Sequence, residues 1–237
     1  LLSIDVLPVR SLYDSTIFRG HQAIVRCANI GSVETFMKLW QEECQRRPHS
    51  GGVAVVLGAG NVTGLAAADA VSQIFEYGRA VLLKLHPVQA SLVKVFRSAL
   101  KPLVEAGLLS VVIGDTELVS DAIKNKEVTA MHLTGGEETF RNIVRSNGSE
   151  LGVKEITCEL GNVTPWIIVP GKYSEKDLLY QADQVAVSIA NNSSFNCIAT
   201  KVVLTSRHWS QRQQFLDRIE QRLASLPARP VWYPGAI

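Results

Sequence analysis

From residue 53 onward, short apolar runs alternate along the chain with stretches that repeat apolar residues at helical spacing. Apolar runs with few polar positions indicate strands that are buried on both faces. These predicted strands cover residues 53–57, 80–85, 108–113, 130–133, 155–160, 166–169 and 201–205. The predicted helices cover residues 62–77, 88–106, 115–125, 137–147, 174–191 and 208–225.

The alternation predicts an α/β fold, with a Rossmann-like open parallel sheet and helices on both of its faces. Gly78, Gly107 and Asn125 support this fold, because glycine and asparagine commonly stop a helix before the next strand. Ligands of such sheets bind beyond the carboxyl ends of the strands. Functional residues are therefore expected near residues 58–61, 84–87, 114–115 and 134–136.

The first 50 residues have a different pattern. We expect a polar segment rich in turns, then an amphipathic helix near residues 33–43, and then a break at the sequence RRPHSGG. No chemistry can be assigned to this appended segment from its residues.

Composition and charge exclude several classes of protein. Hydrophobic residues make up 46% of the chain and charged residues 19%, which supplies a core and argues against disorder. The net charge is +2 with both signs interspersed, so neither a nucleic acid nor a membrane surface is an expected partner. No apolar run is long enough to span a bilayer and no signal peptide is visible, so a cytoplasmic protein is expected.

Four cysteines, Cys27, Cys44, Cys158 and Cys197, show no CxxC pairing and no metal-like spacing with the histidines. Reduced thiols and no metal site are therefore expected. Because Leu1 rather than methionine comes first, the chain is expected to be part of a longer protein.

The sequence VLGAGNVTG at residues 56–64 suggests a dinucleotide fingerprint, but it does not meet the requirements of that motif. The third glycine, Gly64, comes one position late. An acidic residue should end the next strand and bind the ribose, but Lys84, His86 and Pro87 stand there. The glycine turn is therefore not expected to hold a pyrophosphate in the ordinary Rossmann manner.

Four separate motifs from about residue 53 to residue 204 resemble the aldehyde dehydrogenase superfamily. In that family an asparagine follows one strand and a lysine ends the next, and Asn61 and Lys84 stand 23 positions apart, as in the family. The other three matching segments are HLTGGEETF at 132–140, CELGNVTP at 158–165 and NNSSFNCIATKVVLT at 191–205. Their order and spacing make the resemblance more specific than any one of them.

The resemblance implies oxidation of an aldehyde to a carboxylic acid with NAD or NADP as cofactor. Cys197 is the implied nucleophile, because a soft thiolate forms the tetrahedral adduct from which hydride can leave. Asn61, with the Cys197 backbone N–H, is the implied donor to the oxyanion. Glu159, for which burial is expected, is the implied base that activates water against the thioester.

The implied cofactor contacts are Lys84, toward the adenosine ribose, and Gly135 with Gly136, whose backbone N–H groups face the pyrophosphate at a helix start. Each residue also has a local explanation. Asn61 would suit a helix cap, and Cys158 is expected in the core, since strand alternation points it away from Glu159. We expect His86 and His132 to be satisfied by their surroundings, since no triad or metal spacing supports a further role.

Several positions depart from the family. Pro87 falls near the place of a ribose-binding glutamate, which leaves NAD or NADP open, and Ser193-Ser194-Phe195 replaces a Gln-Gly-Gln stretch. Family members also continue well past the cysteine. We therefore expect an appended segment at 1–50, a cofactor-binding Rossmann-like domain at 51–160, and an incomplete catalytic domain at 161–237.

The partner implied by the resemblance is a small-molecule aldehyde, and a homo-oligomer is possible in the full-length form. Two alternatives stay open. An acyl-thioester reductase would use the same cysteine in the reverse direction. A non-catalytic dinucleotide-binding relative, or an inactive fragment, would keep the fold alone.

Overall fold

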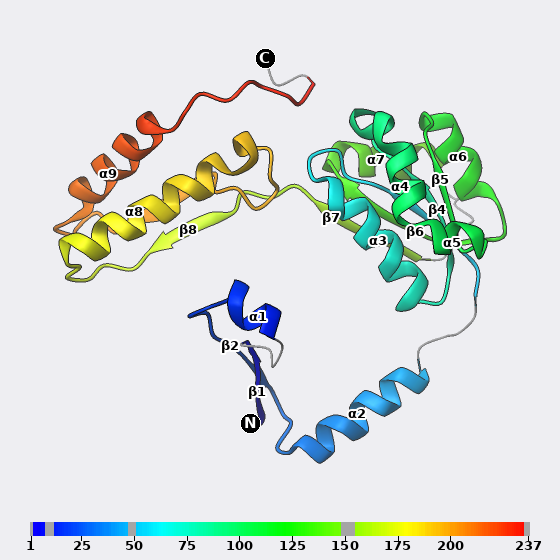
Figure 1. Ribbon diagram of the computed structural model, residues 1–237, viewed down its shortest axis with the longest axis horizontal. Coiled ribbons are helices and arrows are strands. Elements are labelled where there is room, and N and C mark those ends of the chain that lie inside the picture. The colour runs from blue at the N-terminus through cyan, green and yellow to red at the C-terminus, as the bar shows by residue number, and fades with distance from the viewer. Residues whose placement is uncertain (1, 8–11, 47–50, 148–154, 235–237) are drawn as a thin grey trace. The chain divides into compact units, whose positions relative to one another are not determined.

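The computed structural model describes residues 2–7, 12–46, 51–147 and 155–234 (Figure 1). The chain divides into two compact units, residues 1–49 and 50–237.

In the described part of the second unit, five parallel strands form one sheet in the order β5-β4-β3-β6-β7. The strands are β3 (Val53–Leu57), β4 (Ala80–Lys84), β5 (Leu109–Val112), β6 (Val128–Gly135) and β7 (Glu155–Leu160). The central strand β3 is almost fully buried, as its apolar run predicts. The predicted α/β fold with an open parallel sheet is confirmed.

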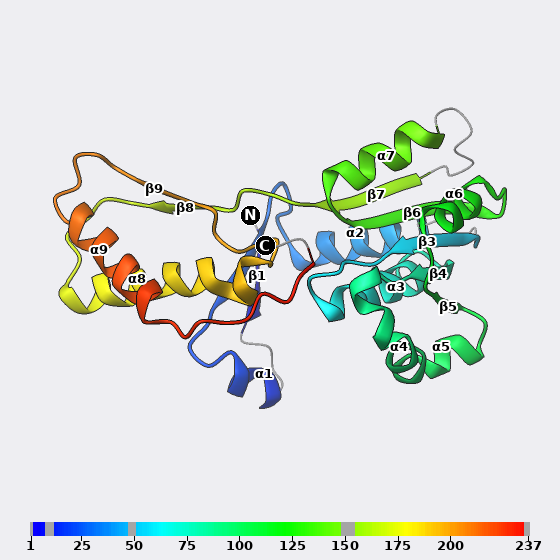
Figure 2. The same cartoon turned by 90° about the horizontal axis from the view of Figure 1, so that it is seen from above.

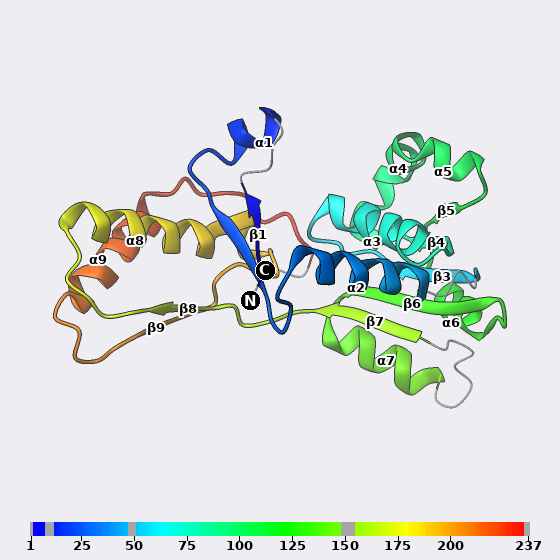
Figure 3. The ribbon, with the colours of Figure 1, turned by 90° about the horizontal axis from the view of Figure 1, so that it is seen from below.

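Helices cover both faces of this sheet (Figure 2, Figure 3). One face packs on α3 (Thr63–Phe75), α4 (Val93–Ala99) and α5 (Lys101–Glu105), through residues such as Ala66, Ala70 and Phe96. The other face packs on α6 (Thr116–Lys124) and α7 (Glu137–Asn147), through Val119 and Ile123 among others. None of the helices in the described ranges has the length and apolar character that crossing a membrane requires.

The helix predicted over residues 88–106 is broken into three pieces. A 3-10 helix, η1 (Pro87–Leu92), leads into α4, and α5 starts afresh at Lys101. Pro102 explains the second break, because proline lacks the N–H that a continuous helix needs and is tolerated in the first turn of a new one.

The second unit also contains a smaller parallel sheet, formed by β8 (Pro165–Ile168) and β9 (Val202–Thr205). The helices α8 (Glu175–Ala190) and α9 (Arg212–Ser225) share a core with it, built around Trp209 and Phe215. The segment between α8 and β9 carries Cys197, and it includes the short 3-10 helix η3 (Asn191–Ser194). The predicted nucleophile therefore lies in a loop that connects a helix to a strand, and not within a regular element.

The first unit contains structure that the sequence pattern did not predict. Antiparallel strands β1 (Leu2–Leu7) and β2 (Ala23–Cys27) flank α1 (Leu12–Ile17), and α2 (Val33–Arg46) follows. The segment contains the expected turns, at residues 18–20 and 28–29, but its two strands and its short helix were not predicted. The two strands pair across an intervening helix, so no short hairpin turn marked them in the sequence.

Candidate active site

The glycine turn after β3 is shaped by close packing. A Cβ on Gly58 would lie 2.7 Å from the Ala66 Cβ, and one on Gly60 would lie 2.5 Å from Nδ1 of His86. The Gly58 N–H donates to the Lys84 carbonyl at 3.0 Å. Only glycine lets this turn approach α3 and the end of β4 so closely, and Asn61 follows directly from it.

The carboxyl end of β4 brings Lys84 beside that turn, opposite Leu57 in the sheet register. Burial lowers the pKa of the half-buried Lys84 ammonium, and the Asp115 carboxylate opposes this shift. An anionic or oxygen-rich ligand beside the ammonium would offset the cost of its burial. This end of the strand is therefore suited to a polar ligand.

His86 has a defined tautomer. Its Nδ1 accepts the Val88 N–H at 3.3 Å as the cap of η1, so the neutral ring carries its hydrogen on Nε2. Burial, and then the nearby Lys84 charge, lower its pKa below the ordinary value of 6.5. The cap of η1 is the local hydrogen bond expected of His86, and its Nε2 also lies 3.4 Å from the hydroxyl of the distant Tyr233.

The His86 shift predicts how stability depends on pH. Below pH 6.5 an unfolded histidine takes up a proton before the folded one does, so the free energy of unfolding should fall as the pH drops through that window. The slope is at most about 1.4 kcal/mol per pH unit, the value for one proton. Urea unfolding between pH 7 and pH 5 measures it, and His86→Asn should give a shallower slope. An equal slope in both proteins would show that His86 does not cause the pH dependence of the unfolding free energy.

The loop that leads to Cys197 is locked onto the Asn61 turn by two hydrogen bonds. The Asn61 side-chain Nδ2 donates to the Phe195 carbonyl at 2.7 Å. The Asn192 Nδ2 donates to the Asn61 carbonyl at 2.9 Å. The side chain of Asn61, the predicted oxyanion donor, is thus hydrogen-bonded to the backbone of Phe195. Phe195 precedes the predicted nucleophile, Cys197, by two residues.

Three consecutive residues of this loop have left-handed backbone conformations, with φ of 51° at Asn192, 54° at Ser193 and 66° at Ser194. Asparagine tolerates this conformation, whereas serine adopts it at a cost of about 1–2 kcal/mol. The Lys201 Nζ holds the loop by donating to the Ser194 carbonyl at 2.6 Å and to its Oγ at 2.7 Å. Ser193 and Ser194, which belong to the segment that replaces Gln-Gly-Gln, are therefore strained, and the hydrogen bonds from Lys201 hold Ser194 in place.

Ser193→Gly should relieve part of this strain. Glycine adopts the left-handed region without a Cβ clash but loses more entropy on folding, so we expect a net gain in unfolding free energy of about 0.5–1 kcal/mol. Urea unfolding measures the gain. The exposed Ser98, in α4, offers a control, since Ser98→Gly should lose about 0.5 kcal/mol. A loss at both positions would show that the Ser193 conformation carries no strain.

Cys197 is half-buried, and its Sγ lies 3.6 Å from Oδ1 of Asn196. The Thr164 hydroxyl donates to the Cys197 carbonyl at 3.0 Å, which ties the cysteine to the segment after β7. All four cysteines are free. The thiol is therefore a fixed, partly accessible group, as a nucleophile requires.

The ends of β6 and β7 bring the remaining predicted residues together. Thr134 pairs with Glu159 and Gly135 with Leu160 in the sheet register, and Gly136 immediately precedes α7. Gly136 has open space around it, since a Cβ there would meet nothing within 4 Å. Glu159 is exposed, so the burial expected for it is not found.

Cys158 is also exposed, and the expectation that it belongs to the core was wrong. Its strand, β7, is the last strand of the sheet, so its side chains have neighbours on one flank only. Strand alternation sets the face toward which Cys158 points, but alternation does not say whether that face is covered.

All six residues predicted from the sequence line one cavity of about 600 Å³. They are Asn61, Lys84, Gly135, Gly136, Glu159 and Cys197. A volume of this size is typical of small-molecule and cofactor sites. Asp115, His86, Phe195 and Tyr233 also line it. Asn61 and Cys197, which lie 136 positions apart in the sequence, thus share one cavity.

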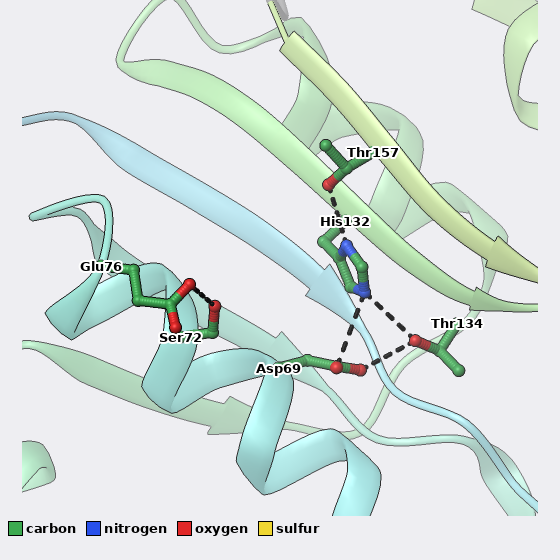
Figure 4. A network of polar contacts seen from close by, with 6 residues as sticks. All are labelled: Asp69, Ser72, Glu76, His132, Thr134 and Thr157. Atoms are coloured by element: carbon green, nitrogen blue, oxygen red, sulfur yellow. Dashed lines mark hydrogen bonds and ion pairs between the residues drawn. The ribbon is translucent and has the colours of Figure 1, made fainter. Parts of the chain in front are cut away.

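A polar network links α3, β6 and β7 next to this cavity (Figure 4). His132 Nδ1 lies 2.8 Å from the Thr157 Oγ1, and its Nε2 lies 3.2 Å from the Thr134 Oγ1 and 3.6 Å from Asp69. The Thr134 hydroxyl donates to Asp69 at 2.8 Å. On the same helix α3, Ser72 donates to Glu76 at 2.8 Å. His132 therefore has the local partners expected of it, and it supports Thr134, which lines the cavity.

Two residues that shape the site were not predicted. Asn192 anchors the Asn61 turn, and Tyr233 lines the cavity from the far end of the chain. The sequence Asn191-Asn192 carries a weak signal, because asparagine favours left-handed loops. Nothing local to Tyr233 marks its role, since its neighbours in the cavity come from distant segments.

The model of the aldehyde dehydrogenase family matches residues 25–233. A 5-carboxymethyl-2-hydroxymuconate semialdehyde dehydrogenase of Escherichia coli is 26% identical over 191 residues, which are 78% of this chain and 39% of that protein.

Two solved structures share the fold. An indole-3-acetaldehyde dehydrogenase complexed with NAD+ superposes with a TM-score of 0.62 at 22% identity, over 73% of this chain and 34% of that one. An aldehyde dehydrogenase of Mycobacterium tuberculosis complexed with NAD+ gives a TM-score of 0.60 at 22% identity, over 75% and 35%. The chain thus spans only 34–39% of the length of these three relatives.

Proposed function

Because the chain belongs to the aldehyde dehydrogenase family, we propose that it carries the catalytic cysteine and cofactor site for NAD(P)-dependent oxidation of an aldehyde to a carboxylic acid. One observation supports this most strongly: the six residues that the sequence assigned to chemistry line a single cavity. Cytoplasmic action on a small aldehyde, and assembly into a homo-oligomer in a longer form, belong to the same proposal.

Cys197 begins the proposed reaction. Its thiolate adds to the aldehyde carbon, a C–S bond forms, and the carbonyl π electrons move to oxygen. The resulting tetrahedral adduct has the electron density from which a hydride can depart. The half-buried position of Cys197 allows an aldehyde to reach the sulfur from the cavity.

Asn61 stabilises the oxygen of that adduct. Its side-chain amide has two N–H groups, and the Phe195 carbonyl takes one of them. The second N–H of the amide can then donate to the oxyanion, from a nitrogen whose position is already fixed. A preorganised donor of this kind lowers the barrier by about 2.7–4 kcal/mol.

When bound, NAD(P) supplies the acceptor for the hydride that leaves the adduct carbon. A thioester then remains on Cys197, and its hydrolysis needs an activated water. Glu159 takes the proton from that water as hydroxide adds to the thioester carbon and the thiolate leaves. The balance is one aldehyde, one water and one NAD(P)+ converted to one acid, one NAD(P)H and one proton.

The chain's residues fit such a cofactor. Lys84 offers a cation, and the open turn at Gly135 and Gly136 offers backbone N–H groups before α7. Glu137 and Glu138 stand in the first turn of α7, where carboxylates disfavour an anion, and Arg141 neutralises Glu137 at 2.5 Å. NAD and NADP are both candidates, since no carboxylate follows Lys84 at the end of β4.

The direct test is formation of NADH or NADPH with a panel of aldehydes, using the chain as it exists. Turnover supports the proposal. An acyl-thioester reductase would instead consume NAD(P)H with an acyl thioester, so both directions are measured. A non-catalytic relative would do neither, and its Cys197 would react with iodoacetamide at a rate that cofactor and aldehyde leave unchanged.

A further inference from the structure

Three aromatic rings gather at the Cys197 end of the cavity. Phe195 and Tyr233 stack with ring centroids 5.4 Å apart and an angle of 27° between planes. Trp232 packs edge-on against both, at 5.6 Å from Phe195 and 5.4 Å from Tyr233. Phe195 and Tyr233 line the cavity, while Trp232 is 41% exposed. The cluster therefore presents two of its rings to a ligand.

These rings are placed beside the reacting groups. Phe195 precedes Cys197 by two residues, and its carbonyl holds the Asn61 amide at 2.7 Å. Tyr233 stacks on Phe195 from the segment that follows α9, and this segment runs back toward the larger sheet (Figure 2). Because Cys197, Phe195 and Tyr233 line one cavity, a group attached to the reacting carbonyl carbon shares that cavity with both rings.

His86 holds Tyr233 in this position. Because Nδ1 of His86 accepts the Val88 N–H, its Nε2 carries the hydrogen and donates to the Tyr233 oxygen, 3.4 Å away. The ring centroids of His86 and Tyr233 also lie 6.0 Å apart. The tyrosine ring is thus anchored at its hydroxyl end as well as by stacking, which preorganises the aromatic wall before a ligand arrives.

We infer that Phe195 and Tyr233 form a subsite for an aryl group, so that the substrate bound at Cys197 is an aldehyde whose carbonyl is attached to, or close to, an aromatic ring. This inference rests on the proposed function and names its substrate class. In the stacked pair, each ring uses one face to contact its partner. The aryl group of a substrate would pack against the faces and edges of Phe195 and Tyr233 that remain. Aromatic contacts add to simple burial and favour offset or edge-on geometry.

Two alkylating reagents test this subsite without requiring turnover. Iodoacetamide and its N-phenyl derivative both label thiols, and their rate ratio with glutathione gives the intrinsic preference. Mass spectrometry of the peptide that contains Cys197 gives the labelling rate of each reagent. The ratio of the N-phenyl rate to the iodoacetamide rate should be about tenfold higher at Cys197 than with glutathione. Tyr233→Leu should bring the ratio to within about twofold of glutathione, and Tyr233→Phe should keep most of the preference.

Tyr180→Leu is the matched control, because Tyr180 is an exposed tyrosine on α8 and should keep the full preference. The subsite is overturned if Cys197 in the unchanged chain shows the glutathione ratio, if neither reagent labels it, or if Tyr233→Leu keeps the preference. Failure of the proposed function looks different: labelling would still favour the aryl reagent while no aldehyde reduced NAD(P).

Discussion

Cys197→Ala should abolish aldehyde-dependent formation of NAD(P)H, with a fall in kcat of at least about 10³-fold. The methyl group of alanine cannot form the covalent adduct, and an unactivated aldehyde has no group that expels a hydride. Binding of NAD(P) should change little, because the proposed cofactor contacts, Lys84 and the turn at Gly135 and Gly136, come from other segments. Steady-state kinetics and a cofactor titration measure the two effects separately.

Cys158→Ala provides the control. Cys158 is an exposed thiol on the edge strand β7, next to Glu159, and its loss should leave kcat within about twofold of the unchanged chain. Equal turnover in the Cys197→Ala protein and the unchanged chain would remove Cys197 from the mechanism.

Asn61→Ala should lower kcat by about 10²–10³-fold, because one preorganised donor to the oxyanion is lost. KM should change much less than kcat, since the donor acts mainly on charge that develops in the transition state. Stopped-flow or steady-state measurement of NAD(P)H formation gives the split between the two constants.

Asn61 also holds the Phe195 carbonyl, so a structural effect has to be separated from a catalytic one. Asn192→Ala removes the other hydrogen bond between the same two loops and leaves the Asn61 amide in place. One neutral hydrogen bond contributes about 0.5–1.5 kcal/mol, so at most about a tenfold loss is expected. If the two variants lost the same activity, Asn61 would be a structural link rather than an oxyanion donor.

Much of the fold follows from residue patterns. The bounds of β3, β7 and α7 agree with the runs at 53–57, 155–160 and 137–147, because burial and helical spacing set them locally. The strands β1 and β2 were missed, since their pairing depends on contacts across α1. The break before α5 was missed because the apolar spacing continues through Pro102, while the backbone does not.

The positions of the candidate site residues could be predicted to a similar extent, while their roles stay predictions. Strand ends predicted where Lys84 would lie, since parallel strands end at one edge of a sheet, and Glu159 followed from the family resemblance. Burial was less predictable: Glu159 and Cys158 are exposed because β7 is an edge strand, which no local pattern reveals. The role of Tyr233 depends on a segment that returns from α9, and only tertiary structure brings it to Phe195.

The central step of the proposed reaction is the formation of a bond between the Cys197 sulfur and the carbon of an aldehyde. Mixing the chain with NAD(P) and an aryl aldehyde, quenching with acid within the first turnover and mapping the peptides by mass spectrometry tests it directly. An acyl group on the peptide that contains Cys197, and on no other cysteine, is the expected result. Formation of NAD(P)H with Cys197 unmodified would contradict the account.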